Sequence, residues 1–336
     1  MRDPRLRLAV VTTALQVLGQ TVLGFKVSIA QIVVSIAVCA AVELAVTYRR
    51  KHVLTWPASA ILTGNSIALL LRATGTQHGD WWSLNGIQFF VLAALVGILS
   101  KYLVRPGGRH VFNPSNLGLV VCLLLAGPAR VFPQPLWWGP MEVPVMLAWI
   151  VILMGGAWVL WSLRMAPMVA GFVVTFIVLI AAFAAQGQCF FAVWRATPVC
   201  GANYWLGIAA SPELAVFVLL MMSDPKTSPA AARGRALYGA ATAVVAAALI
   251  YIQPSEWGIK LALLASLTIV CAAIGLATWM RRREPAPAHA RPGSGLAAMA
   301  ALVVALVVPV AVVADAESQQ VLQVDRPPAT GTPGLQ

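Results

Sequence analysis

The sequence predicts an all-α protein that crosses a membrane about ten or eleven times. Of its 336 residues, 60% are hydrophobic and only 10% are charged, whereas an ordinary soluble domain is about a quarter charged. A membrane-spanning helix needs roughly 20 predominantly apolar residues, so the chain has room for about ten spans joined by short connections. A soluble globular protein is therefore excluded, and little of the chain is left for a soluble domain.

The predicted spans are apolar runs separated by clusters of Pro, Gly, Trp and charged residues. The first run follows Arg2, Arg5 and Arg7, as a signal peptide would, but no cleavage site of small residues follows it, and we interpret it as a helix. The third and fifth runs are short for a membrane span, at about sixteen and fifteen residues. In order, the spans are 8–24, 28–47, 57–72, 84–104, 113–127, 143–162, 166–185, 204–222, 235–252, 258–280 and 294–314.

The distribution of positive charge predicts the topology. Alternate loops hold 17 and 6 of the 23 Lys and Arg residues, and basic residues accumulate in cytoplasmic loops. The N-terminus is therefore expected in the cytoplasm and, after eleven spans, the C-terminus outside. Topology also explains the net charge of +12, which in a soluble protein would suggest a nucleic-acid partner. No nucleic-acid partner is expected here.

The C-terminal part differs from the core in composition. We expect a transmembrane core over residues 1–280, a Pro- and Ala-rich linker over 284–295 and an additional transmembrane helix over 294–314. The tail 315–336 carries Pro, Gly and polar residues and too little apolar surface to fold alone, so it is expected to be disordered.

Three polar segments interrupt the apolar spans, namely 59–66, 107–116 and 222–229. Unpaired polar groups in hydrocarbon are costly, and short interrupted spans in both halves of a membrane protein indicate broken helices that line an interior site. Asn113 and Pro114 fit the cap and first position of a helix, whose free N–H groups would attract an anion or the oxygens of a flavin. The alternative is a well-capped helix start at the membrane interface.

Single acidic residues and cysteines supply the remaining candidates. Glu43 and Glu213 lie in or near spans, where burial of a carboxylate is costly, and Glu213 is the stronger candidate for an interior role. Its alternative is a carboxylate that stabilises a helix start, and Asp224 before Pro225 is equally suited to cap a turn. Cys189 and Cys200 share a connection on the predicted outer side, where an oxidising compartment permits a disulfide between them. The cysteine and histidine spacings predict no metal site and no catalytic group.

Three motifs, in order, resemble a known family. They are Ser59-Ala60-Ile61-Leu62-Thr63-Gly64, Phe112-Asn113-Pro114-Ser115-Asn116, and Ser223-Asp224-Pro225-Lys226-Thr227-Ser228 with a following Arg233-Gly234-Arg235. They are similar to motifs of the RnfD/NqrB family, whose members are integral-membrane proteins of the Rnf electron-transport complex and of the sodium-pumping NADH:quinone reductase. The resemblance covers roughly residues 25–280. It implies two inverted five-helix repeats, over about 1–127 and 143–280, with interrupted helices, as in urea transporters.

The resemblance also implies electron transport by flavins in a bacterial cytoplasmic membrane. Redox activity would arise only within a complex, with other electron-transfer subunits or an extracytoplasmic flavin domain as partners beside the membrane lipids. The family's covalent FMN is attached to a Thr in the outer loop after the Phe-Asn-Pro helix, but loop 127–142 has no threonine. Thr197 imitates that motif one outer loop later. The expected cofactor is therefore a noncovalent flavin, FMN or riboflavin, bound by Asn113, Pro114, Ser115, Asn116, Asp224, Thr227 and Ser228.

Two rival functions remain open. Divergent relatives of this kind accompany natural-product gene sets such as those for enediyne biosynthesis. The rivals are a channel or transporter for a small molecule and a membrane scaffold for a biosynthetic assembly. The polar lining of such a pore or pocket would be Thr63, Asn65, Ser66 and Glu213.

Overall fold

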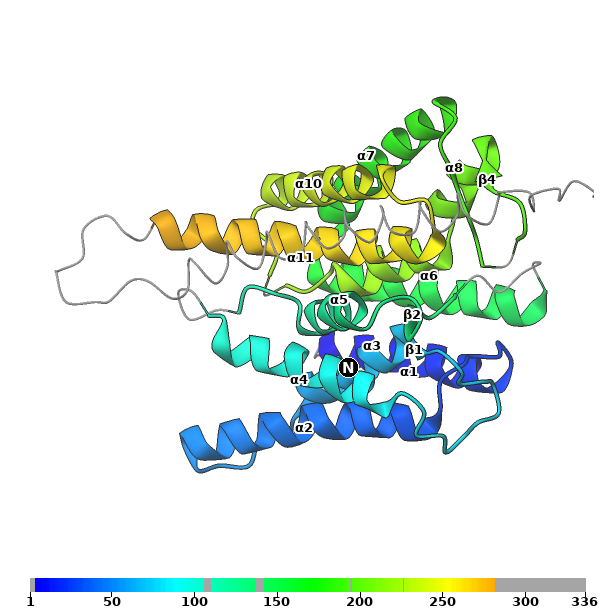
Figure 1. Ribbon diagram of the computed structural model, residues 1–336. Coiled ribbons are helices and arrows are strands. Elements are labelled where there is room, and N and C mark those ends of the chain that lie inside the picture. Colours follow the sequence, from blue (N-terminus) through cyan, green and yellow to red (C-terminus); the bar gives the residue numbers. More distant parts are fainter. Residues whose placement is uncertain (1–3, 106–109, 137–141, 194, 226, 282–336) are drawn as a thin grey trace, which may run out of the picture.

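The computed structural model describes residues 4–105, 110–136, 142–193, 195–225 and 227–281. The predicted linker 284–295, the predicted helix 294–314 and the predicted tail 315–336 lie outside these residues. Within them the chain is mostly helical (Figure 1).

The first half contains five helices, each within or close to a predicted span. Ser28 caps the second through a capping box with Gln31, and Asn113 caps the fifth, with Pro114 at its first position. The third and fifth each have only 13 residues, fewer than predicted. The five are α1 (Pro4–Thr21), α2 (Ile29–Lys51), α3 (Ala58–Leu70), α4 (Ile87–Leu103) and α5 (Pro114–Ala126).

The second half differs from the prediction in its third helix. The predicted span 204–222 is interrupted at Ala210, where one helix ends, and Ser211 caps the next, with Pro212 at its first position. The segment then continues as a π-helix, an uncommon form that is frequent at functional sites. The elements are α6 (Val143–Leu163), α7 (Ala166–Ala185), α8 (Gly201–Ala209), α9 (Pro212–Val216), the π-helix η2 (Phe217–Met221), α10 (Ala232–Tyr251) and α11 (Glu256–Arg281).

Six helical stretches among the described residues are long and apolar enough to cross a membrane, judged by length and composition. They are α2, α6, α7, the combined stretch Gly201–Met221, α10 and Glu256–Met280. The helices α3, α4 and α5 are apolar but shorter. The chain is thus a mostly helical protein with several helices suited to a membrane.

Helix packing follows a similar order in the two halves. In the first half α2 packs on α3 and α4, α4 on α5, and α1 on α3. In the second half α7 packs on α8 and α10, α10 on α11, and α6 on α9 and η2. The halves meet through α1 with α6 and through α5 with α11. In Figure 1 the blue and cyan helices lie below α10 and α11, with α5 between them.

Glycines allow two of these helix pairs to approach closely. A Cβ on Gly239 of α10 would lie 2.0 Å from the carbonyl oxygen of Met168 in α7, and a Cβ on Gly118 of α5 would lie 2.2 Å from that of Ala93 in α4. Small residues at helix contacts are typical of membrane bundles, where association depends on close packing.

The interior also contains a two-stranded ribbon that an all-α prediction omits. Strand β1 (Leu71–Ala73) follows α3, and it pairs antiparallel with β2 (Val131–Pro133), which follows α5. The Trp257 indole N–H donates to the carbonyl oxygen of Val131, at 3.1 Å. The predicted span 57–72 therefore ends early, because its last residues satisfy their backbone groups in a ribbon that the protein encloses.

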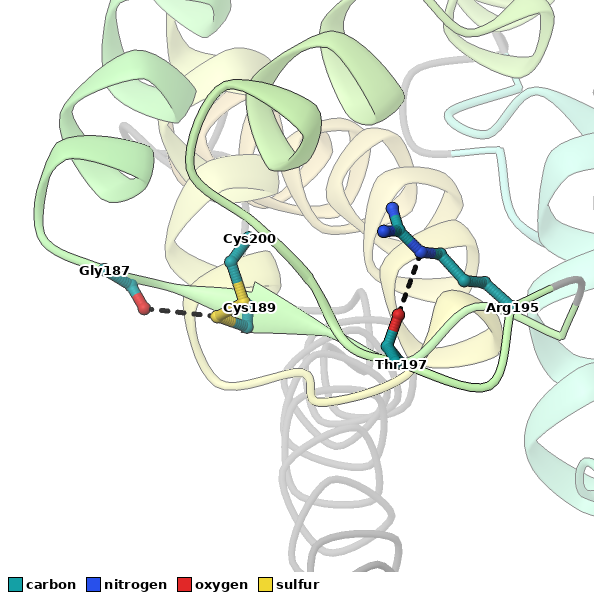
Figure 2. Close-up of a disulfide and its surroundings, with 5 residues drawn as sticks. All are labelled: Gly187, Cys189, Arg195, Thr197 and Cys200. Atoms are coloured by element: carbon teal, nitrogen blue, oxygen red, sulfur yellow. Dashed lines mark hydrogen bonds between the residues drawn. A yellow bond between two sulfur atoms is a disulfide. The ribbon is translucent and has the colours of Figure 1, made fainter.

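A second short ribbon forms the connection between α7 and α8. Strands β3 (Cys189–Phe190) and β4 (Val199–Cys200) pair antiparallel, and Cys189 and Cys200 form a disulfide. Figure 2 shows this bond beside Arg195 and Thr197, whose side chains are hydrogen-bonded to each other, with Arg195 Nε donating. We call residues 189–200 the disulfide hairpin.

Candidate functional site

A cavity of about 430 Å³ lies where the two halves meet, and we call it the central cavity. The first half contributes α1, α3, the end of α4 and the start of α5, and the second half contributes the end of α6, the end of α9, η2 and the turn after it. Its polar lining comprises Thr12, Ser59, Thr63, Ser66, Lys101, His110, Asn113, Ser115, Ser223 and Asp224. The remaining lining is mainly leucine and valine.

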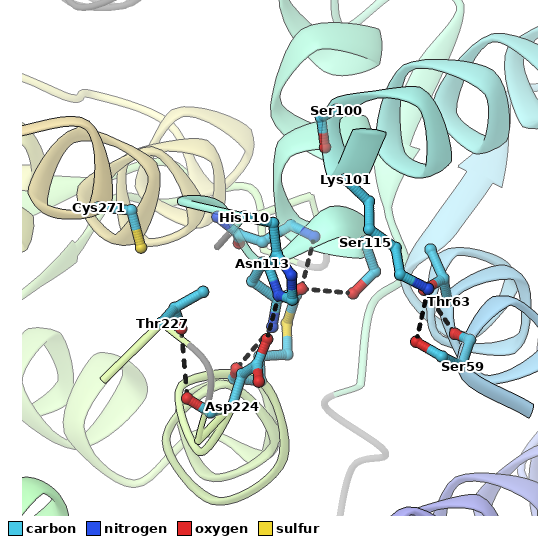
Figure 3. Close-up of polar contacts among 12 residues, drawn as sticks. Ser59, Thr63, Ser100, Lys101, His110, Asn113, Ser115, Asp224, Thr227 and Cys271 are labelled. Atoms are coloured by element: carbon cyan, nitrogen blue, oxygen red, sulfur yellow. Dashed lines mark hydrogen bonds and ion pairs between the residues drawn. The ribbon is translucent and has the colours of Figure 1, made fainter. Parts of the chain in front are cut away.

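Asn113 joins the two halves at this cavity. Its side-chain oxygen accepts hydrogen bonds from the Ser115 hydroxyl at 2.9 Å and from the backbone N–H of Asn116 at 3.3 Å. Its amide nitrogen donates to the carbonyl oxygen of Met221 at 2.8 Å. The side chain therefore caps α5 and also holds the end of η2. As a result, two motifs that are far apart in the sequence lie together in the structure (Figure 3).

The turn after η2 supplies the acidic side of the cavity. The Asp224 carboxylate lies 3.5 Å from Nε2 of His110. The backbone oxygen of Asp224 accepts from both the backbone N–H and the hydroxyl of Thr227, at 3.4 and 3.3 Å. Asp224 therefore lies in a turn, as one sequence interpretation predicted, and it also lines the central cavity.

Hydroxyl groups line the cavity along α3. Ser59, Thr63 and Ser66 follow one another at helical spacing, so their side chains lie on one face. Lys101 Nζ donates to the Ser59 hydroxyl at 3.1 Å and also forms an ion pair with Glu43. Glu43 therefore lies behind the cavity wall, where it neutralises Lys101.

Five residues predicted for the site do not line the central cavity: Glu213, and the four residues Asn65, Asn116, Thr227 and Ser228. The Asn65 amide donates to the Thr12 hydroxyl at 2.9 Å and joins α3 to α1. The Asn116 amide donates to the Leu264 carbonyl and the Thr268 hydroxyl, and so joins α5 to α11. Thr227 binds the backbone of Asp224, and the Ser228 hydroxyl lies 3.7 Å from the Met165 sulfur. The structure gives each of these four a contact that holds elements together.

Glu213 lies at a different cavity from the one formed by Thr63 and Ser66. Its Oε1 is 2.9 Å from Lys260 Nζ and accepts from the backbone N–H of Leu136 at 2.8 Å. Of the four residues predicted for one polar lining, only Thr63 and Ser66 therefore share the central cavity.

Comparison with known sequences adds no relative. The sequence matches no family model and no curated protein. The resemblance to the electron-transport proteins therefore depends on the three motifs.

Five polar lining residues were not predicted as site residues: Ser59, His110 and Ser223 lie within the three polar segments, whereas Thr12 and Lys101 lie outside them. Lys101 carried a usable signal, because it and Glu43 are opposite charges near the ends of apolar spans, and such charges pair inside a bundle. Thr12 carried no signal, since a threonine in an apolar helix is common.

The central cavity is suited to a small ligand that has both polar and apolar parts. Its lining combines hydroxyls, an amide, an imidazole, an ammonium group and a carboxylate with aliphatic side chains. Its volume falls within the usual range for small-molecule sites, about 300–1,000 Å³. Among the described residues, no group of three or more His, Cys, Asp or Glu side chains is placed to hold a metal ion.

Proposed function

We propose that this protein is the membrane subunit of a flavin-dependent electron-transport system, and that a noncovalent flavin, FMN or riboflavin, binds in the central cavity. The observation that carries the proposal is the joining of the Asn113 motif to the Asp224 motif, through the hydrogen bond from Asn113 to Met221. Both motifs resemble those of the Rnf and NADH:quinone reductase proteins, and together they line one cavity.

The cavity's chemistry supports a flavin. A flavin combines an apolar face with a row of ring oxygens and nitrogens, and supplies the redox chemistry when bound. Asn113, Ser115 and His110 offer polar groups at the positive end of α5. Ser59, Thr63 and Ser66 offer hydroxyls for a polyol chain, and the aliphatic wall suits the ring face. The protein's part is to bind and orient the cofactor and to keep it from bulk water.

A noncovalent flavin is supported by the position of Thr197. That residue is exposed on the disulfide hairpin and accepts a hydrogen bond from Arg195. It does not line the central cavity. The central cavity itself contains Thr12 and Thr63, both within helices and both bonded to backbone oxygens of the preceding turn.

The proposal includes ten spans in the core, with an eleventh over 294–314, and two inverted five-helix repeats. The parallel order of helix contacts in the two halves supports the repeat. So does a short sequence match: Asn113-Pro114-Ser115 opens α5, and Gln253-Pro254-Ser255 comes directly before α11, the last helix of the second half. The proposed setting is a bacterial cytoplasmic membrane with the N-terminus inside, and the proposed partners are other electron-transfer subunits or an extracytoplasmic flavin domain.

Flavin retention tests the proposal. The full chain, purified in mild detergent, is expected to absorb as a flavin in the visible range and to release free flavin on denaturation, with no added mass on the protein. Asn113→Ala is expected to lose the flavin, whereas Asn65→Ala, at an amide outside the lining, is expected to keep it. A colourless preparation that takes up no flavin on reconstitution would contradict the proposal.

A small-molecule transporter is the second candidate, and one observation favours it. The central cavity and a second cavity border the same interrupted helix, since Val216 lines the first and Leu214 lines the second. Discontinuous helices of this kind form substrate sites in transporters. Uptake of a labelled small solute into proteoliposomes, without flavin in the purified protein, would favour this candidate. The same result would fit a role beside natural-product enzymes such as those of enediyne biosynthesis.

A further inference from the structure

The second cavity, of about 520 Å³, lies beneath the disulfide hairpin, and we call it the hairpin cavity. It is bordered by α7, α8, α9 and the first turns of α11. The hairpin is fixed over it, because Phe191 exchanges backbone hydrogen bonds with Pro254 and Glu256 at 2.7 and 2.9 Å. None of the three sequence motifs contributes to this cavity.

Two carboxylates and one ammonium group meet at this cavity. Lys260 Nζ is 2.6 Å from Glu256 Oε1 and 2.9 Å from Glu213 Oε1. The backbone N–H of Val193 donates to Glu256 Oε2 at 3.0 Å, and that of Leu136 donates to Glu213 Oε1. The three side chains together carry a net charge of −1. Such a charge in a poorly solvated site is costly unless a cation compensates it.

One carboxylate oxygen is left for a ligand. Both oxygens of Glu256 have partners, and Oε1 of Glu213 accepts twice. Within the described residues the structure gives Oε2 of Glu213 no hydrogen-bond partner, and this side chain, 12% exposed, lines the cavity. Lys260 Nζ is itself fully covered, with the Phe132 ring 5.6 Å away. The group that faces a ligand is thus the carboxylate and not the ammonium.

The walls of the cavity are apolar and partly aromatic. Phe176 and Phe190 lie among aliphatic residues from α8, α10 and α11. Aromatic faces attract cations and apolar surfaces alike. Arg195 also lines the cavity, but on the exposed hairpin, where its Nε is bonded to Thr197. The negative charge is therefore buried, and the opposing positive charge is at the solvated edge.

From this arrangement we infer that the hairpin cavity is a second binding site, which takes an organic monocation: an ammonium group carried on an apolar body. The ammonium group lies against Oε2 of Glu213, and the apolar body lies against Phe176 and Phe190. The site is independent of any flavin in the central cavity.

Binding of benzyltrimethylammonium to the full chain, measured by calorimetry in a nonionic detergent at low salt, tests the inference. Benzyl alcohol and benzenesulfonate serve as the neutral and anionic comparison probes. The cation is expected to bind at least about tenfold more tightly than either. If benzyl alcohol bound as tightly as the cation, the cavity would bind apolar groups without a role for the carboxylate. If benzenesulfonate bound most tightly, Arg195 would be the charged group that binds the ligand. Either result overturns the inference.

Substitutions of single carboxylates test whether the cation binds at Glu213. Glu213→Gln is expected to weaken its binding at least about tenfold, because the net negative charge is removed. Glu142→Gln, at an exposed carboxylate before α6, is the matched control and is expected to bind as the parent does. Unchanged binding in Glu213→Gln would overturn the inference.

A second variant fills the cavity with a larger side chain, and it tests the inference even if Glu213→Gln does not fold. A Cβ on Gly207 would make only ordinary contact with Phe190, at 3.7 Å, so the position has room. Gly207→Leu is expected to fold and to abolish binding by filling the cavity, whereas Gly207→Ala is expected to retain it. Cation binding that survives in Gly207→Leu would place the ligand elsewhere and overturn the inference.

Discussion

The two cavities differ in how their polar groups are satisfied. In the central cavity most polar groups are neutral hydroxyls and amides, and Glu43 neutralises Lys101 from behind the wall. The hairpin cavity has few polar groups, but it places two carboxylates, Glu213 and Glu256, against Lys260. The first arrangement leaves many weak hydrogen-bonding groups for a large polar edge, and the second leaves one strong charge. The difference indicates two ligands of different chemistry.

The two cavities also differ in the parts of the chain that form them. The central cavity is shared by both halves of the chain, with the Asn113 side chain as the link. The described lining residues of the hairpin cavity come from the second half, with the disulfide hairpin as its cover. Damage to one cavity should therefore leave the other in place.

The largest effect is expected from Lys260→Met. The change removes the ammonium and leaves two buried carboxylates facing each other, which is expected to cost about 3–5 kcal/mol of unfolding free energy. Denaturant unfolding followed by circular dichroism measures this loss. Lys51→Met, at an exposed lysine, is the control and should change stability little. A loss below about 1 kcal/mol would mean that the three side chains do not hold α9 and α11 together.

An intermediate effect is expected from the double change Cys189→Ser and Cys200→Ser. The disulfide closes a loop with a sequence separation of 11 residues, and its removal should cost about 2–3 kcal/mol through the entropy of the unfolded chain. Binding of benzyltrimethylammonium should weaken, because the hairpin covers that cavity. Flavin content should stay unchanged. A parallel loss of flavin would show that the two cavities are not independent.

These cavities show which features the sequence can predict. The polar segments near Thr63, Asn113 and Asp224 were predictable because polar groups are rare and costly in apolar spans. Cys189 and Cys200 were predictable because they share one short connection. The start and end of most helices followed from the apolar runs.

The remaining features depend on tertiary contacts. The strands β1 and β2 have three residues each, too few for a strand period to be visible, and Pro133 argues against a strand. The pairing of Glu256 with Lys260 was readable as a helical i, i+4 pair. The pairing of Lys260 with Glu213 was not, because it needs the interrupted helix to place α9 beside α11. Asn65 and Asn116 belong to the same class: the sequence marks them as polar, but only packing decides that they bind neighbouring helices.

The smallest effect, and the sharpest for the central cavity, is expected from Asn113→Asp. The carboxylate keeps the oxygen that caps α5 but loses the N–H that donates to the Met221 carbonyl, and it places like charge near that oxygen. Stability is expected to fall by about 1–2 kcal/mol. Flavin affinity is expected to fall about tenfold, because η2 no longer holds the Asp224 turn against α5. Asn65→Asp, at an amide that joins α3 to α1, is the control: a similar loss of stability without loss of flavin is expected there. If both variants lost flavin equally, general loosening of the bundle would explain the result. The link between the two halves at Asn113 would then have no special role.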